Sequence, residues 1–183
     1  MKKNGFTLIE MMIVVAIIGI FSTIAIPAFT SWLPARKLKS AASDIYSDMQ
    51  YAKMGAIKER AEWAVVFNYS NNLYTIWSGG DDGVYEGGTG DDALQKTVSL
   101  TDNGYGITYG HGNATTAAGE SFGGDNVTFS INDVVFTKRG MLSNSDMTGG
   151  YVYIHNDRKE TYAVNARVTG VIMLKRWNGS EWK

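Results

Sequence analysis

Residues 6–29 read FTLIEMMIVVAIIGIFSTIAIPAF, an apolar run that carries a single charge, on Glu10. A helix of about 20 apolar residues is long enough to cross a bilayer core of roughly 30 Å. The run is too long for a secretory signal peptide, and no small-residue cleavage site follows it. We therefore expect a transmembrane helix over residues 6–29. Basic residues flank both of its ends, so the flanking charge leaves its orientation open.

Glu10 needs a physical explanation, because a carboxylate at mid-bilayer costs roughly 2.5–3.5 kcal/mol on insertion scales. Thr7 and Glu10 have the T-x-x-E spacing of a capping box at a helix start. Alternatively, another molecule could supply a cation that pairs with the carboxylate. Both explanations could hold at different stages.

The composition limits the remaining chemistry. With 44% hydrophobic and 19% charged residues among 183, the chain is not globally disordered, and its length suggests one domain with one appendage. The net charge of −1 shows no basic excess of the kind that nucleic-acid binders carry. Without cysteine there is no disulfide and no thiolate metal site. We expect no cofactor and no metal.

A second helical pattern follows Pro27. From Leu38 onward, apolar residues recur in steps of three and four, which predicts an amphipathic helix to about Arg60. Neither Pro27 nor Pro34 offers an N–H group to the helix, so we expect a kink or a local opening at this junction.

The rest of the chain has the period of a strand. Candidate strands are residues 63–69, 73–77, 94–100, 127–131, 134–137, 151–155, 161–166 and 170–177. Short turns without helices between strands predict an antiparallel sheet or sandwich. The glycine-rich stretches 78–92 and 104–125 are expected to be long, mobile surface loops. The predicted fold is α+β, with a long N-terminal helix, half transmembrane and half amphipathic, packed on an antiparallel head domain.

The start of the chain resembles a type IV prepilin, through the sequence Lys2-Lys3-Asn4-Gly5 followed by Phe6-Thr7-Leu8-Ile9-Glu10. The resemblance implies that residues 1–5 are a leader, that prepilin peptidase cleaves between Gly5 and Phe6, and that the new amine of Phe6 is methylated. It also implies a single pass through the bacterial inner membrane, with the head in the periplasm. Glu10 would then pair with the amine of a neighbouring subunit, and Glu10 and Pro27 are the expected assembly residues.

The C-terminal part is similar to the GspH/FimT group, in which a phenylalanine-x-x-x-glycine element precedes hairpin strands and a closing glycine. Here these residues are Phe136, Gly140 and Gly170. The implied domains are the amphipathic helix, residues 30–61, and a periplasmic head, residues 62–183. The implied partners are other pseudopilins or pilins, through the N-terminal helix, and the inner-membrane assembly platform.

This resemblance implies a structural subunit and not an enzyme. The favoured function is a minor pseudopilin at or near the tip of the type II secretion pseudopilus, which assists protein export across the outer membrane. The alternative is a FimT/FimU-like minor pilin that primes type IV pilus assembly, with DNA binding for uptake as an added option.

Three further groups of residues are candidates for binding or catalysis. Six acidic residues between 81 and 102 could hold Ca²⁺, but a solvated loop is the favoured interpretation. Lys175 and Arg176, followed by Trp177, are candidate DNA contacts. However, Val171 and Met173 replace the arginines that DNA-binding FimT-like pilins carry, so DNA contact is not favoured. His111 and His155 have no acid or nucleophile at a diagnostic spacing.

Overall fold

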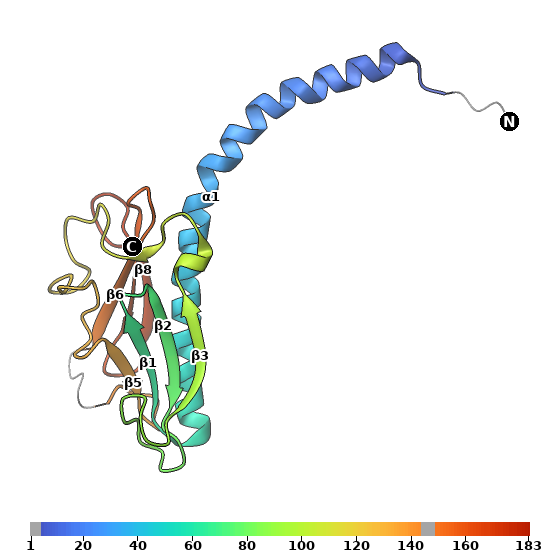
Figure 1. The fold of residues 1–183 in the computed structure, drawn as a ribbon. Helices are drawn as coiled ribbons and strands as arrows, with labels where there is room; N and C mark the ends of the chain where they lie inside the picture. The colour runs from blue at the N-terminus through green and yellow to red at the C-terminus, as the bar shows by residue number, and fades with distance from the viewer. Residues whose placement is uncertain (1–4, 144–148) are drawn as a thin grey trace. The chain divides into compact units, whose positions relative to one another are not determined.

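The computed structural model describes residues 5–143 and 149–183, with the side chains of 24–28 left out. The chain divides into two compact units, residues 1–34 and residues 35–183. Helix α1, Leu8–Glu59, belongs to both units (Figure 1). Its helical assignment is unbroken at Pro27 and Pro34, so the expected opening of the helix does not occur. The proline ring fixes φ near −65°, which is itself a helical value.

The strands of the second unit form two four-stranded sheets. They are β1 (Trp63–Asn68), β2 (Leu73–Ser78), β3 (Ala93–Ser99), β4 (Thr108–Tyr109), β5 (Asp133–Phe136), β6 (Gly150–His155), β7 (Thr161–Ala166) and β8 (Ile172–Arg176), with a short 3-10 helix at Thr101–Asn103. One sheet has the order β3-β2-β1-β5 and the other β4-β6-β7-β8, and every pairing is antiparallel. The α+β prediction, with a helix packed on antiparallel sheets, is confirmed.

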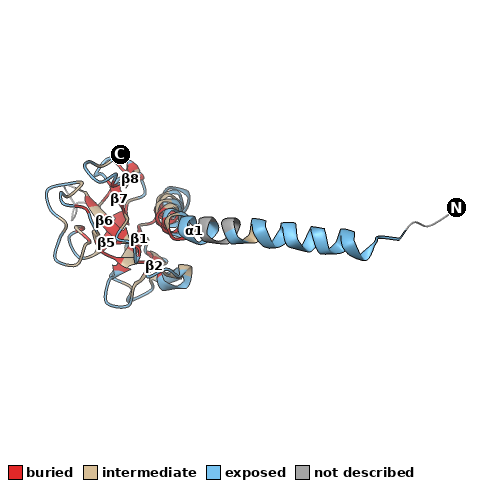
Figure 2. Ribbon diagram, turned by 90° about the horizontal axis from the view of Figure 1, so that it is seen from above, coloured by how far each residue is buried: buried red, intermediate tan, exposed pale blue. Residues whose placement is uncertain are grey.

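The helix and both sheets share one core. The predicted apolar stripe of α1 is fully buried at Leu38, Ile45 and Met49 and at the alanines between and beyond them. It packs with residues of both sheets, including Val65, Tyr74, Ile76, Val152, Ile154 and Val164. Figure 2 shows the buried residues of this unit gathered between the helix and the strands. The second unit begins at Ala35 and thus includes this helical segment.

One predicted strand was wrong. Residues 127–131 form no strand, and only Val127 makes an isolated bridge, to Val152. The Asp125 carboxylate accepts the Val127 N–H at 3.1 Å, and Asn126 and Asn132 have positive φ values of 66° and 61°. Such local side-chain bonds and left-handed residues compete with an extended ladder. Conversely, the predicted loop 104–125 contains the short strand β4.

Candidate functional site

Helix α1 begins with a complete capping box. The N–H and the hydroxyl of Thr7 each donate to Glu10 Oε2 at 2.8 Å, and the Glu10 N–H donates to Thr7 Oγ1 at 3.3 Å. These reciprocal bonds satisfy backbone donors that a helix start leaves free. The capping explanation of Glu10 is therefore seen directly. Its pairing with the amine of a neighbouring subunit stays a prediction.

The predicted processing site precedes this cap. Gly5 and Phe6 lie outside the helix and are exposed, so the bond between them is in irregular backbone. Cleavage at this bond and methylation of Phe6 stay predictions.

The large apolar side chains of the first unit are exposed. Their exposed fractions range from 47% to 79% at Phe6, Leu8, Ile9, Met11, Met12, Ile13, Val14, Val15, Ile17, Ile18, Ile20 and Phe21. A helix that is apolar on every side is normally buried in a membrane or by other protein. Within the described residues, no helix combines the length and the apolarity that crossing a membrane requires. The predicted span 6–29 includes Pro27 and its neighbours 24–28, whose side chains lie outside the described residues, and it stays a prediction.

The residues of the C-terminal motif meet beside the helix. Phe136 is fully buried and pairs with Trp63 across the first sheet. Lys53 Nζ on the helix donates to the Gly170 carbonyl at 2.8 Å. Gly170 has φ +75°, and a Cβ at this position would collide with the carbonyl oxygen of Gly140. The two glycines thus allow two turns to pack back to back against α1, which gives the motif a structural reason.

Comparison with known proteins gives the family. The model of the prokaryotic N-terminal methylation motif matches residues 1–26, and that of the type II transport protein GspH matches residues 41–171. The chain belongs to the GspH family. The residues matched by the GspH model include most of the buried helical stripe and every strand except β8, so the predicted membership is confirmed.

Relatives of this GspH-family chain include pilus proteins. A fimbrial protein of Pseudomonas aeruginosa is 35% identical over 101 residues, which cover 55% of this chain and 61% of the relative. The chain thus spans about three fifths of that relative's length. The crystal structure of the type IV minor pilin FimU of P. aeruginosa has a TM-score of 0.55 at 16% identity and covers 81% of this chain and 94% of that one. This likeness shows that the two share a fold. The minor pseudopilin EpsH of Vibrio cholerae has a TM-score of 0.45 at 12% identity, over 75% of this chain and 95% of that one.

The candidate DNA contacts of the GspH-family head do not share a surface. Consecutive strand residues point to opposite faces, which separates Lys175 from Arg176. Lys175 Nζ lies 5.6 Å from the ring centroid of Tyr151, and Arg176 Nη2 lies 3.9 Å from a Glu160 oxygen. Trp177 is buried, so it is not an exposed stacking ring. DNA contact stays a prediction that this arrangement does not favour.

The acidic stretch uses its carboxylates to organise its own loop. Asp91 Oδ2 accepts the N–H groups of Asp81 and Asp82, at 2.6 and 3.2 Å. Asp92 Oδ2 accepts those of Glu86 and Gly88, at 2.9 and 2.8 Å. Among the described residues, no three His, Asp or Glu side chains converge as a metal site would require. Bonds to backbone donors therefore give Asp91 and Asp92 a structural role in the loop.

The sequence did not reveal that the two histidines lie near each other. Burial lowers the pKa of His155, and the nearby charges of Lys159 and His111 lower it further. His111 stacks on Phe122 with 4.0 Å between the ring centroids, and Phe122 meets Tyr153 edge-on at 5.1 Å. His111 therefore belongs to an aromatic layer on the second sheet, and His155 lies in β6 of that sheet. The separation of the two histidines in the sequence hid this proximity.

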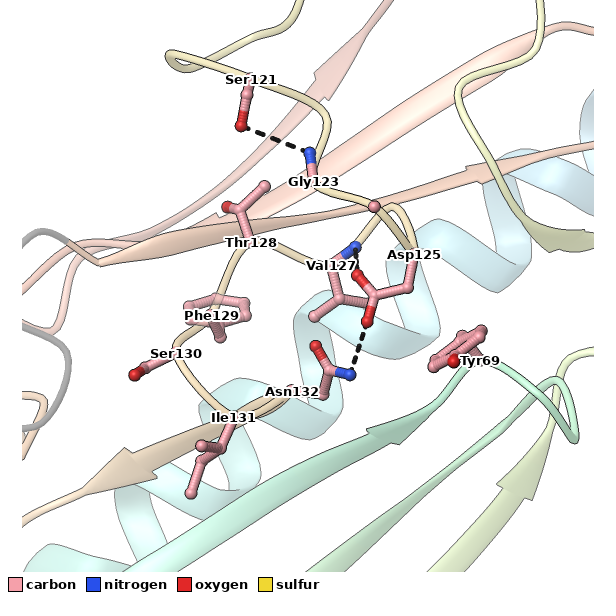
Figure 3. A pocket seen from close by; sticks show the side chains of 11 residues that line it. Tyr69, Ser121, Gly123, Asp125, Val127, Thr128, Phe129, Ser130, Ile131 and Asn132 are labelled. Carbon is pink, nitrogen blue, oxygen red and sulfur yellow. Dashed lines mark hydrogen bonds between the residues drawn. The ribbon is translucent and has the colours of Figure 1, made fainter.

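An open pocket of about 690 Å³ lies between the β1–β2 turn and residues 121–132 (Figure 3). One of its polar groups is the Asp125 carboxylate, which accepts the Val127 N–H and, at 2.6 Å, an N–H of the Asn132 amide. The side chain of Ile131 at the rim is 72% exposed. Because its carboxylate is already satisfied by neighbouring donors, this pocket does not resemble a catalytic centre.

Proposed function

We propose that this chain is a minor pseudopilin, a structural subunit at or near the tip of the type II secretion pseudopilus. The observation that carries the proposal is the exposed apolar helix before residue 24, joined to a head of the GspH family. Burying apolar surface is favourable by roughly 25 cal/mol per Å². The exposed helix is therefore stabilised when neighbouring helices or lipid cover it, as they would in a membrane and then in a filament.

The proposed maturation and location follow the N-terminal methylation motif. Prepilin peptidase would cleave between Gly5 and Phe6 and methylate the Phe6 amine. The helix would then hold the chain in the inner membrane as a single pass, with the head in the periplasm. From there the assembly platform would add it to the filament, with Glu10 and Pro27 in the helix contacts between subunits.

A second candidate function is a minor pilin that primes type IV pilus assembly. The relatedness to a Pseudomonas fimbrial protein and the FimU-like fold favour it. The two functions are distinguished by deleting the gene in its own host. Loss of exported proteins with normal pili supports the pseudopilin, whereas loss of surface pili with normal export supports the pilin.

Two matched variants test the role of Glu10 in assembly. Glu10→Gln keeps a side chain that can cap the helix but removes the charge. Thr7→Ala removes the two capping bonds of the Thr7 hydroxyl but keeps the Glu10 carboxylate and the backbone N–H that donates to it. If Glu10 neutralises a neighbouring amine, Glu10→Gln leaves that amine unpaired in apolar surroundings, which costs several kcal/mol locally.

We therefore expect Glu10→Gln to be processed and to stay in the membrane, yet to be missing from sheared filaments. Thr7→Ala should still enter them. Filament fractions are compared by immunoblot, and intact mass confirms processing of both variants. If Glu10→Gln enters filaments at the wild-type level while Thr7→Ala does not, Glu10 is only a cap.

A further inference from the structure

An exposed apolar patch lies on three segments: the turn that contains Gly140 (residues 137–142), the turn that contains Gly170 (residues 167–171), and the end of α1. Its members are Met54 and Ile57 on the helix, Met141 in the first turn, and Val168 and Val171 in the second, with exposed fractions from 36% to 68%. A Cβ on Gly140 would lie 2.7 Å from Ile57, and the Leu142 N–H donates to the Val168 carbonyl at 3.0 Å. These contacts place the two turns beside Ile57, and Met54 lies three residues before Ile57 on the helix. We call the exposed apolar residues of these segments the turn patch.

Cations surround the turn patch. Lys58 follows Ile57 on the helix, Lys138 and Arg139 occupy the first turn, and Arg167 begins the second, all of them exposed. No salt bridge is recorded for these four side chains within the described part of the chain. The described residues of the two turns, 137–142 and 167–171, contain no carboxylate.

An apolar centre with a basic rim indicates a binding surface. Exposed apolar patches with a polar rim mark sites of protein or membrane interaction. Interfacial membrane sites typically insert Trp, Phe or Leu, and the turn patch offers only Met, Ile and Val. Met and Arg are enriched in protein interfaces, and Met adapts its shape to different partners. A protein partner is therefore favoured over a lipid surface.

We propose that the turn patch binds an acidic, amphipathic segment of a partner protein. Apolar side chains of the segment would cover Met54, Ile57 and Val171, and its carboxylates would meet Arg139 and Arg167. The charges steer association and select the partner, and the apolar contacts slow dissociation. This inference goes beyond the proposed function and does not depend on it, because the binding is measured on the isolated chain.

The test uses the full chain in phosphatidylcholine nanodiscs and a labelled amphipathic helical peptide built only of leucine and glutamate. Fluorescence anisotropy measures the affinity. We expect binding that weakens with added salt, and a peptide with lysine in place of each glutamate should bind at least about tenfold more weakly.

Matched variants locate the site. The double variant Arg139→Glu/Arg167→Glu should weaken binding at least about tenfold, whereas Lys37→Glu/Lys39→Glu, the same charge change on the helix, should not. Val171→Asp should weaken it too, whereas Ile131→Asp, at an exposed apolar residue of another loop, should not. A thermal melt of each variant confirms that the head is folded.

Three outcomes would overturn the proposal. The lysine peptide could bind as well as the glutamate peptide, or the variants in the patch could bind as well as their controls. Alternatively, phosphatidylglycerol vesicles could bind in a manner that depends on Arg139 and Arg167 while the acidic peptide does not, which would make the patch a membrane site.

Discussion

We expect alanine substitutions at three glycines to destabilise the fold by different amounts, which depend on the atoms that each new methyl group would meet. Gly87, Gly140 and Gly170 have similar positive φ values, +80°, +73° and +75°. An alanine adopts a positive φ at a cost of roughly 1–2 kcal/mol at each position. What differs is the space around the new methyl group, because nothing lies within 4 Å of a Cβ at Gly87.

At Gly140 the methyl group would meet the end of the Ile57 side chain at 2.7 Å, and at Gly170 it would meet the backbone carbonyl of Gly140. A side-chain end can rotate away, but a carbonyl moves only with its turn. Overpacking of this kind adds typically 1–3 kcal/mol, so Gly170→Ala should cost about 2–5 kcal/mol in total. Gly87→Ala should cost about 1–2 kcal/mol, and Gly140→Ala should fall between the two.

Thermal unfolding followed by circular dichroism is the assay. In a protein of this size each kcal/mol lowers Tm by about 2–4 °C, so Gly170→Ala should melt roughly 4–20 °C below the wild type. Gly87→Ala should lose roughly 2–8 °C by the same conversion. Equal losses at all three positions would show that the left-handed backbone alone matters, and would refute the packing argument for the Gly140–Gly170 contact.

Three more outcomes are expected. Intact-mass analysis of membrane-extracted protein should give a chain that begins at a methylated Phe6, and a full-length form alone, in cells with active prepilin peptidase, would contradict the assignment. Asp48→Ala removes the partner of the buried Tyr74 hydroxyl, 2.7 Å away, and should cost about 1–3 kcal/mol in a denaturant melt. Lys96→Met, on the half-exposed partner of Asp48, leaves the Tyr74 bond in place and should cost less. Burial raises the pKa of Tyr85 to about 12, so its neutral form stabilises the fold fully below pH 10, and this contribution is lost as the pH rises from 10 to 12. Melts at pH 9 and pH 11.5 should therefore differ, and a smaller difference in Tyr85→Phe would assign part of it to this residue.

The sequence predicted those elements whose signal is local. The stripe from Leu38 to Ala56 has an unambiguous helical period, and the alternation in β1 and β2 surrounds a clear Asn-Asn turn, so both were identified. Residues 127–131 carry the same alternation but form no strand, because the Asp125 side chain and left-handed Asn126 and Asn132 turn the backbone away. Periodicity reports which residues can be buried, not whether a neighbouring strand is within reach.

The contacts that join distant segments could not be predicted in this way. The Asp48–Lys96 ion pair links positions 48 residues apart, and Lys53 reaches Gly170 across 117 residues. Spacing along the chain carries no information about either contact. The family resemblance identified Gly140 and Gly170 as characteristic residues, but only the structure shows that the two turns touch.

The two explanations of Glu10 are compatible, because they can use different oxygens of one carboxylate. Both donors from Thr7 reach Oε2, and among the described residues no hydrogen bond to Oε1 is recorded. A carboxylate has about four lone-pair sites, so it can cap its own helix and still accept a cation. The cap also fixes the side chain beside the first turn, which lowers the entropy lost when a partner amine binds. If Glu10 acts in this way, removing the hydroxyl bonds of the cap with Thr7→Ala should weaken assembly slightly, whereas removing the charge with Glu10→Gln should abolish it. A capping box that only began the helix would be equally well served by glutamine, so the difference between these two variants measures how much the charge contributes.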